Sequence, residues 1–182
     1  DFMLILGGNP LPSNGSIMTV PDVEKRLKAI QARGGKVVVV DPRRSETAAN
    51  ADQHLFVRPG GDAALLFGLL HTLFAEGLTR DSHLPVDGLD QVREAVTGFS
   101  ADVMSPLCPV PAERIRQLAR DFAAAPTAVC YGRMGVSTQA FGTLCHWLVQ
   151  LINLVTGNLA RVRGALCTEP AVDLVASTSG GH

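Results

Sequence analysis

Four short segments of the sequence combine glycine with side chains that bind nucleotides. In chain order they are Gly7-Gly8-Asn9, Asp41-Pro42-Arg43, Gly60-Gly61-Asp62 and Gly132-Arg133-Met134-Gly135. Glycine lets backbone N–H groups approach a phosphate closely, carboxylates accept hydrogen bonds from ribose hydroxyls or a guanine edge, and arginine pairs with phosphate. Together the segments predict a binding site for a nucleotide-bearing ligand.

Each segment also has a structural explanation that needs no ligand. Gly7 and Gly8 suit a tight turn, and Asp62 stands where the N-cap of a helix is expected. Asp41-Pro42-Arg43 suits a strand-ending turn that carries a surface arginine, and Met134 suits core filling. The nucleotide site is therefore indicated by the set of segments and by none of them alone.

The elements that must position these segments alternate between strands and helices. Short apolar runs predict buried parallel strands at 2–7, 36–41, 54–57 and 127–131. Helical spacing predicts helices from Val23, from Ala63 to about Glu76, around Ile115 to Phe122 and from Thr138 to Thr156, with a loosely helical stretch at 79–111. The pattern predicts an α/β fold, a Rossmann-like doubly wound and mainly parallel sheet with helices on both faces.

The predicted sheet brings the four segments together. We expect residues 3–7, 36–41 and 127–131 to be parallel strands of one sheet, because each is a short apolar run that ends in a turn. Ligands of such sheets bind outside the carboxyl ends of the strands. The four segments should therefore meet on one rim.

Composition excludes several functional classes. The chain has 182 residues, 46% of them apolar, and its 16 basic and 17 acidic residues give no electrostatic footprint for nucleic acid. No apolar stretch reaches the ~18 residues of a membrane span, and the start lacks the basic region of a signal peptide. We expect a cytoplasmic protein, with the periplasm as the alternative.

The ends of the sequence predict a piece of a longer polypeptide. The chain begins without methionine, directly in a buried strand, and finishes in small polar residues. We expect one cofactor-binding domain over 1–160 and an extension over 161–182 that leads to the next domain.

Cysteine and histidine give no sign of a metal site. The cysteines form no Cys-x-x-Cys pair, so buried free thiols are expected at Cys108, Cys130, Cys145 and Cys167. Structural or solvated roles are expected for His54, His71, His83 and His146. We therefore predict neither metal ligands nor catalytic residues in this chain.

The order of the segments resembles the dimethyl-sulfoxide-reductase superfamily of molybdenum and tungsten oxidoreductases, and most closely its formate-dehydrogenase-like members. The resemblance covers about residues 2–160. It rests on Gly7-Gly8-Asn9-Pro10, Val40 to Ala48 with Ala51-Asp52, Arg58 to Leu66, Met134-Gly135-Val136 and Leu154 to Leu159. Residues 159–164 depart from the Gly/Pro-rich turn that the family has there.

The resemblance implies a domain that binds one of two molybdopterin guanine dinucleotides attached to Mo or W. Gly7, Gly8, Asn9 and Ser13 would approach the diphosphate; Asp41, Pro42 and Arg43 would line the nucleoside; Gly61 and Asp62 would address guanine. Met134 and a polar residue after it would reach towards the pterin. The family has glutamine shortly after its Met-Gly, where an ungapped alignment places Thr138 and leaves Gln139 one step later.

The resemblance also implies what lies elsewhere in a full-length protein. An iron–sulfur cluster and the metal-ligating residue belong to other parts of the polypeptide, so this chain alone should not catalyse. The implied partners are the remaining domains of the same polypeptide and redox partner subunits that receive electrons.

Two other interpretations remain open. One is a non-catalytic relative such as the large iron–sulfur subunit of complex I. The other is a domain that binds NAD or FAD, or the middle domain of a thiamine-diphosphate enzyme. An NAD site is disfavoured because neither glycine turn matches G-x-G-x-x-G, and Pro10 stands where a helix should open.

Overall fold

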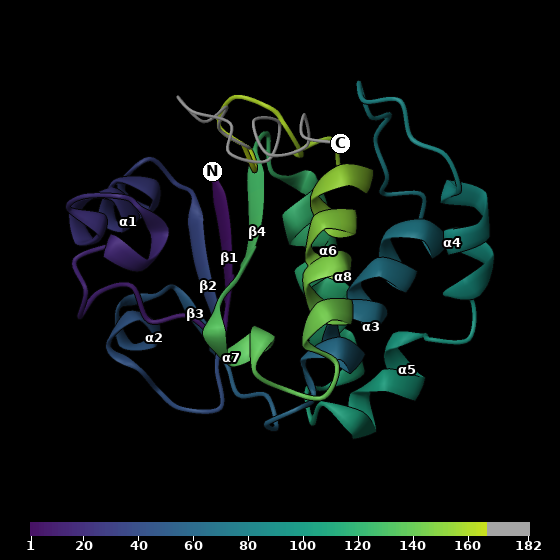
Figure 1. Ribbon diagram of the computed structural model, residues 1–182, viewed down its shortest axis with the longest axis horizontal. Helices are drawn as coiled ribbons and strands as arrows, with labels where there is room; N and C mark the ends of the chain where they lie inside the picture. The colour runs from purple at the N-terminus through teal and green to yellow at the C-terminus, as the bar shows by residue number, and fades with distance from the viewer. Residues whose placement is uncertain (167–182) are drawn as a thin grey trace, which may run out of the picture.

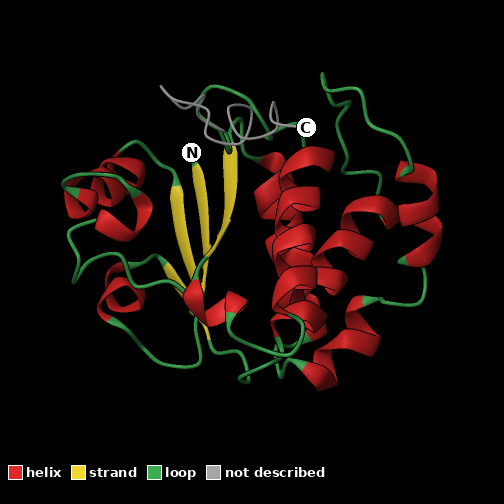
Figure 2. Cartoon of the chain, viewed as in Figure 1, coloured by secondary structure: helices red, strands yellow, loops and turns green. Residues whose placement is uncertain are grey.

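The computed structural model describes residues 1–166, which form one parallel sheet covered by helices on both faces (Figures 1 and 2). The strands are β1 (Phe2–Leu6), β2 (Lys36–Val40), β3 (Gln53–Leu55) and β4 (Ala128–Gly132), in the order β3-β2-β1-β4. Every pairing is parallel, and Leu6 lies beside both Val40 and Gly132. The predicted parallel arrangement is confirmed.

Two layers of helices bury the two faces of the sheet. One layer consists of α1 (Val23–Ala32) and α2 (Glu46–Asn50), and the other of α3 (Asp62–Ala75), α6 (Ala112–Ala124) and α8 (Gly142–Val155) (Figure 1). The shorter elements are α4 (Leu89–Ala95), α5 (Ala101–Met104), α7 (Met134–Ser137) and the 3₁₀ turns Ser16–Met18 and Ser105–Leu107.

Alternation along β1 explains why both faces are apolar. Leu4 and Leu6 pack into the core formed with α3, α6 and α8, whereas Ile5 packs with Val23 and Leu27 of α1. Successive side chains of a strand point to opposite faces, so a strand covered on both sides is apolar at every position.

Helix α3 lies within the larger core, as its all-round apolar sequence predicts. Leu65, Leu66, Leu69, Leu70 and Leu73 are all buried. Burial of one such leucine contributes ~1.5–3 kcal/mol to folding. This strongly held helix begins at the rim where the candidate site lies.

Two asparagine side chains hydrogen-bond the outer edge of strand β4. Asn153 Oδ1 accepts a hydrogen bond from the Cys130 N–H at 2.8 Å, and Asn158 Oδ1 accepts one from the Ala128 N–H at 3.0 Å. These bonds satisfy edge groups that another strand would otherwise pair with. Asn158, part of the family-like stretch Leu154 to Leu159, therefore has a structural role.

Some element boundaries differ from the sequence-based expectation. The helix expected from Thr138 to Thr156 begins only at Gly142, as α8, and the short helix α7 lies before it, in the turn expected after β4. The chain is tightly packed where α8 begins, since a Cβ on Gly142 would clash with the Ser137 carbonyl oxygen. Asp62 is the first residue of α3, and Gly61 occupies the N-cap. The interpretation of Asp62 as an N-cap is therefore wrong.

The strand order creates a topological switch point between β1 and β4. From β1 the chain proceeds to β2 and β3 on one side, and it later adds β4 on the other side of β1. Loops that follow the two central strands therefore diverge and leave a crevice at their carboxyl ends. Two of the four predicted segments, after β1 and after β4, flank this crevice.

Candidate functional site

The turns after β1 and β4 are joined by close backbone contact. The Gly135 N–H donates to the Gly7 carbonyl at 3.0 Å, and a Cβ on Gly7 would lie 2.7 Å from the Val136 nitrogen. Gly7 also has φ of 58°, a left-handed conformation that glycine adopts without strain. Packing alone therefore explains both glycines, and their contact fixes the floor of the crevice.

Gly8 makes room for Arg133. A Cβ at residue 8 would lie 3.2 Å from the Arg133 Cβ, so the stem of the arginine runs past the turn after β1. The Arg133 Nε atom is buried and has no hydrogen-bond partner among the described residues. A cationic group is thus held at the switch point with unused hydrogen-bonding capacity.

Asp62 and Gln139 form the polar centre of the site. Asp62 is 5% exposed, and its Oδ2 accepts a hydrogen bond from Gln139 Nε2 at 3.0 Å. The same Nε2 donates to the Gly135 carbonyl at 3.1 Å, while Gln139 Oε1 is buried and has no hydrogen-bond partner in the part of the chain that the structure describes. This arrangement leaves one carboxylate oxygen of Asp62 and one amide oxygen of Gln139 as acceptors.

Burial raises the pKa of Asp62 above its usual value, and the nearby charge of Asp41 adds to this, although the hydrogen bond from Gln139 opposes it. A carboxylate at a helix N-terminus is normally favoured by the helix dipole. Here the desolvation of the charge outweighs that effect. Asp62 therefore carries an electrostatic cost that a hydrogen-bond donor from a ligand would relieve.

The structure distinguishes between the two polar residues that follow Met134. Gln139 reaches Asp62, whereas the Thr138 hydroxyl donates to the Met134 carbonyl at 2.8 Å within its own helical turn. Met134 is 64% exposed, so its interpretation as a core residue is wrong.

The segment after β2 lies beside this centre. Asp41 Oδ1 accepts a hydrogen bond from the Arg43 N–H at 2.8 Å and so closes the turn around Pro42. The Arg43 side chain is 72% exposed, and its only charged neighbour within 4 Å in the described part of the chain is Glu46, at 3.9 Å. The guanidinium of Arg43 is therefore free to reorient.

Asn9 and Ser13 are engaged within the protein. Asn9 Oδ1 accepts hydrogen bonds from the Thr47 N–H at 3.1 Å and hydroxyl at 2.7 Å, and its amide donates to Glu46 at 2.6 Å. The Ser13 hydroxyl donates to the Pro10 carbonyl at 3.1 Å. Their side chains hold the loop after β1 in place, so any ligand contact at Asn9 would come from its backbone.

Gly61 is required by packing at the start of α3. A Cβ there would lie 3.0 Å from the Arg58 carbonyl oxygen and 3.0 Å from the Cys108 Cα. Gly61 therefore brings the first turn of α3, with Asp62, close to the neighbouring loop.

Sequence reasoning assigned no role to Arg133, Glu46 or Thr47. Arg133 lies inside a predicted segment, and its position directly after a strand was the available signal. Glu46 and Thr47 lie within the family-like stretch Val40 to Ala48, but nothing in their spacing shows that they hold Asn9.

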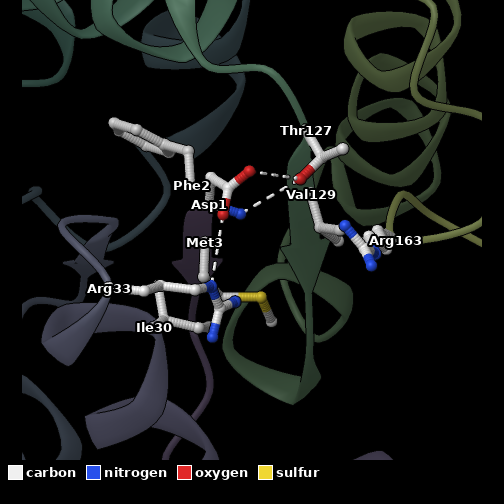
Figure 3. A pocket seen from close by; sticks show the side chains of 8 residues that line it. All are labelled: Asp1, Phe2, Met3, Ile30, Arg33, Thr127, Val129 and Arg163. Atoms are coloured by element: carbon white, nitrogen blue, oxygen red, sulfur yellow. Dashed lines mark hydrogen bonds and ion pairs between the residues drawn. The ribbon is translucent and has the colours of Figure 1, made fainter.

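A hollow of about 520 Å³ lies at the opposite, amino-terminal edge of the sheet (Figure 3). It is lined by Arg33 and Arg163 together with Asp1 and Thr127. Asp1 pairs with Arg33 at 3.2 Å and accepts a hydrogen bond from the Thr127 hydroxyl at 3.1 Å. Ligands of parallel α/β sheets bind at the carboxyl ends of the strands, so a nucleotide is not expected in this hollow.

Over residues 1–166 no group of three or more His, Cys, Asp or Glu is arranged to hold a metal ion. Cys108, Cys130 and Cys145 are buried free thiols, as predicted, and Cys167 lies outside the described residues. No helix in the described part of the chain is long and apolar enough to cross a membrane.

A doubly wound parallel sheet with glycine turns, a buried carboxylate and a cation at its switch point defines a nucleotide-binding class of α/β domain. The molybdopterin oxidoreductase family matches residues 1–166, and the chain belongs to that family. The resemblance seen in the sequence is thereby confirmed.

Individual relatives show the same relationship. The chain is 29% identical to formate dehydrogenase H of Escherichia coli over 183 residues, covering 96% of the chain and 25% of that protein. It is 30% identical to a dimethyl sulfoxide/trimethylamine N-oxide reductase of Cereibacter sphaeroides, covering 87% of the chain and 21% of that protein. The chain thus spans a quarter or less of the length of these relatives.

The fold is shared with a solved structure. Acetylene hydratase from Pelobacter acetylenicus superposes with a TM-score of 0.76 at 26% sequence identity, over 90% of this chain and 22% of that one. The α/β architecture predicted from the sequence is confirmed by this likeness.

Proposed function

We propose that this chain is the domain of a molybdenum or tungsten oxidoreductase of the formate-dehydrogenase-like kind that binds a molybdopterin guanine dinucleotide. The observation that carries the proposal is the buried Asp62–Gln139 pair at the rim of the switch point. Its unused acceptors match a ligand that presents N–H donors, as the edge of guanine does.

The residues present fit such a cofactor. Arg133 Nε and Gln139 Oε1 are buried polar atoms that no described residue hydrogen-bonds, and buried polar groups are nearly always hydrogen-bonded. Asp62 would accept hydrogen bonds from guanine, Asp41, Pro42 and Arg43 would line the nucleoside, and the backbone of Gly7, Gly8 and Asn9 would approach the diphosphate.

Met134 would face the pterin end. Gln139 is preferred over Thr138 as a ligand-binding residue because its amide reaches the rim, and since it contacts Asp62 it would lie beside the guanine. When bound, the cofactor supplies the redox chemistry, and the domain supplies its position and electrostatic surroundings. We expect no formate or nitrate turnover from this chain alone, because the metal-ligating residue and the electron-transfer centre would belong to other parts of the longer protein. An iron–sulfur cluster and redox partners would belong to the longer protein.

The test is nucleotide selectivity of the 182-residue chain. We expect calorimetry to show tighter binding of guanosine diphosphate than of adenosine diphosphate. Asp62→Asn should weaken binding of the guanine nucleotide about ten- to a hundredfold, because the single amide oxygen of asparagine is neutral and would already accept from Gln139, whereas the carboxylate keeps an anionic oxygen for the guanine N–H groups.

The matched control is Asp102→Asn, the same change at an exposed carboxylate on α5 that pairs with Arg116. It should leave binding of both nucleotides unchanged. Equal affinity of the parent chain for the two nucleotides, or unchanged binding by Asp62→Asn, would contradict the proposal.

A further inference from the structure

Arg133 occupies the centre of the switch point. It directly follows β4, and its backbone N–H donates to the Leu6 carbonyl at 3.0 Å, which ties it to the end of β1. The side chain then runs beside Gly8, where a Cβ would lie 3.2 Å from the Arg133 Cβ and 3.6 Å from its Cγ. The backbone and the side-chain stem of Arg133 are therefore fixed between the ends of β1 and β4.

The charge of Arg133 has no counterion in the described part of the chain. No carboxylate there lies within 4 Å of its guanidinium, and its Nε is buried without an acceptor. Some other arginines pair with carboxylates, as Arg120 does with Glu76 at 2.8 Å, but among the described arginines only Arg133 buries a side-chain nitrogen that has no hydrogen-bond partner. A buried cationic donor without a partner is unfavourable and indicates an anion that the structure does not itself provide.

The field of Arg133 reaches the loop after β1. Burial raises the pKa of the Tyr131 phenol, and the positive charge of Arg133 opposes that rise. The Tyr131 hydroxyl donates to the Ile17 carbonyl at 3.1 Å, so it lies against the loop that connects β1 to α1. The positive charge of Arg133 therefore acts on a phenol that contacts the segment between β1 and α1.

We propose that Arg133 is an anion-binding residue that pairs with the diphosphate of the dinucleotide at the β1/β4 switch point. The guanidinium presents its donors in a planar fork that matches two phosphate oxygens. Gly8 has no side chain that would occupy the space beside it. This inference rests on the proposed function for the identity of the ligand, and on Arg133 itself for the anion.

The experiment compares guanosine diphosphate, guanosine and inorganic pyrophosphate by calorimetry on the 182-residue chain. Arg133→Gln should weaken binding of guanosine diphosphate and pyrophosphate about tenfold or more and leave guanosine unchanged, because only the phosphates contact the arginine. Arg133→Lys should give a smaller loss, since it keeps the charge and removes the fork.

Arg33→Gln is the matched control, because it removes the same charge from the hollow at the amino-terminal edge of the sheet. It should not change the affinity for any of the three ligands. Loss of pyrophosphate binding in Arg33→Gln instead of Arg133→Gln would move the anion site to that hollow and overturn the assignment.

Thermal unfolding without ligand separates binding from a structural role. Because Arg133 has no carboxylate partner in the described residues and its buried Nε is unpaired, its removal should leave the melting temperature of the unliganded chain unchanged or raise it. A lower melting temperature in Arg133→Gln, with weaker binding of all three ligands, would make Arg133 structural and overturn the inference.

The outcomes also distinguish this inference from the proposed function. Pyrophosphate binding that depends on Arg133, without any preference for guanine, supports the anion site and contradicts the guanine site. Guanine-selective binding that depends on Asp62 and not on Arg133 overturns only the anion site. Failure of the parent chain to bind any of the three ligands overturns both.

Discussion

Two charged regions of this protein differ in how their polar atoms are satisfied. On the surface of α6, Arg116 and Arg120 pair with Asp102, Glu113 and Glu76 at 2.8–2.9 Å. At the switch point, Arg133 and Gln139 each bury a polar atom that has no partner among residues 1–166, and the burial of Asp62 raises the pKa of its carboxyl group. The polar groups of the first region satisfy one another, whereas the second region keeps buried polar atoms that no described residue satisfies.

The difference between the surface of α6 and the switch point indicates that a ligand should be sought at the switch point. Exposed ion pairs contribute little to stability and lose nothing when no ligand is bound. Buried polar groups that lack partners cost stability, and proteins tolerate that cost at functional sites. If the two regions differ in this respect, substitutions at the switch point should have larger effects than substitutions on the surface of α6.

The contact between the turns after β1 and β4 should be the most sensitive feature of the switch point. Gly7→Ala introduces a Cβ 2.7 Å from the Val136 nitrogen at a residue with φ of 58°. We expect a loss of ~3 kcal/mol in the free energy of unfolding, from strain and from forced separation of the turns. Urea unfolding measures it.

Gly34→Ala is the matched control for Gly7→Ala. Gly34 also has positive φ, at 83°, but nothing lies within 4 Å of its would-be Cβ. It should cost only the conformational part, ~1 kcal/mol. Equal losses in the two variants would show that the turns are not held by close packing.

The anchoring of the loop after β1 should have an intermediate effect. Asn9→Ala removes the acceptor of the Thr47 N–H and hydroxyl bonds and the donor to Glu46. We expect a loss of ~1–2 kcal/mol in unfolding free energy, because partly buried donors on Thr47 lose their partner. Asn50→Ala, which removes an exposed bond to the Glu46 carbonyl, should cost less. A larger loss in Asn50→Ala would contradict the anchoring role.

Sequence and structure agree where local pattern decides and differ where distant contacts decide. The strands were predictable because apolar runs end in turns, and the parallel sheet followed from their alternation with helices. Which of Thr138 and Gln139 reaches Asp62 could not be predicted, because it depends on where the single turn of α7 ends. The unpaired Nε of Arg133 depends on contact with Gly8, a residue 125 positions away, which no local pattern records.

The helix start at Asp62 shows the same limit on a smaller scale. Sequence reasoning placed Asp62 at an N-cap, one residue from its true position inside α3. Helix ends are often misplaced by a residue or two because several residues can satisfy the first N–H groups. Here the shift moves the carboxylate from a capping role to the buried rim of the site.

The stability of the switch point should respond to pH through Asp62. Its folded-state pKa is raised above 3.8 chiefly by burial, so the folded protein loses stability as pH rises from 3.8 through that raised value. Asp62→Asn should therefore make the unliganded chain more stable at neutral pH, with a gain that shrinks as pH falls. Urea unfolding at pH 4 and pH 7 measures it, and lower stability of the variant at pH 7 would contradict the assigned cost.

The smallest effect is expected on the surface of α6, where the sign of the pH dependence should be opposite. Hydrogen bonds from Arg120 lower the pKa of Glu76 below 4.5, so its contribution to stability is present above pH 4.5 and is lost as pH falls through the lowered value. Glu76→Gln should cost ~0.5 kcal/mol at neutral pH, because the pair is partly exposed. The cost should vanish in acid, and binding of guanosine diphosphate should stay unchanged. Weaker nucleotide binding in Glu76→Gln would show that the ion pairs on the surface of α6 are coupled to the switch point. The two charged regions would then not be independent, and the comparison between them would be wrong.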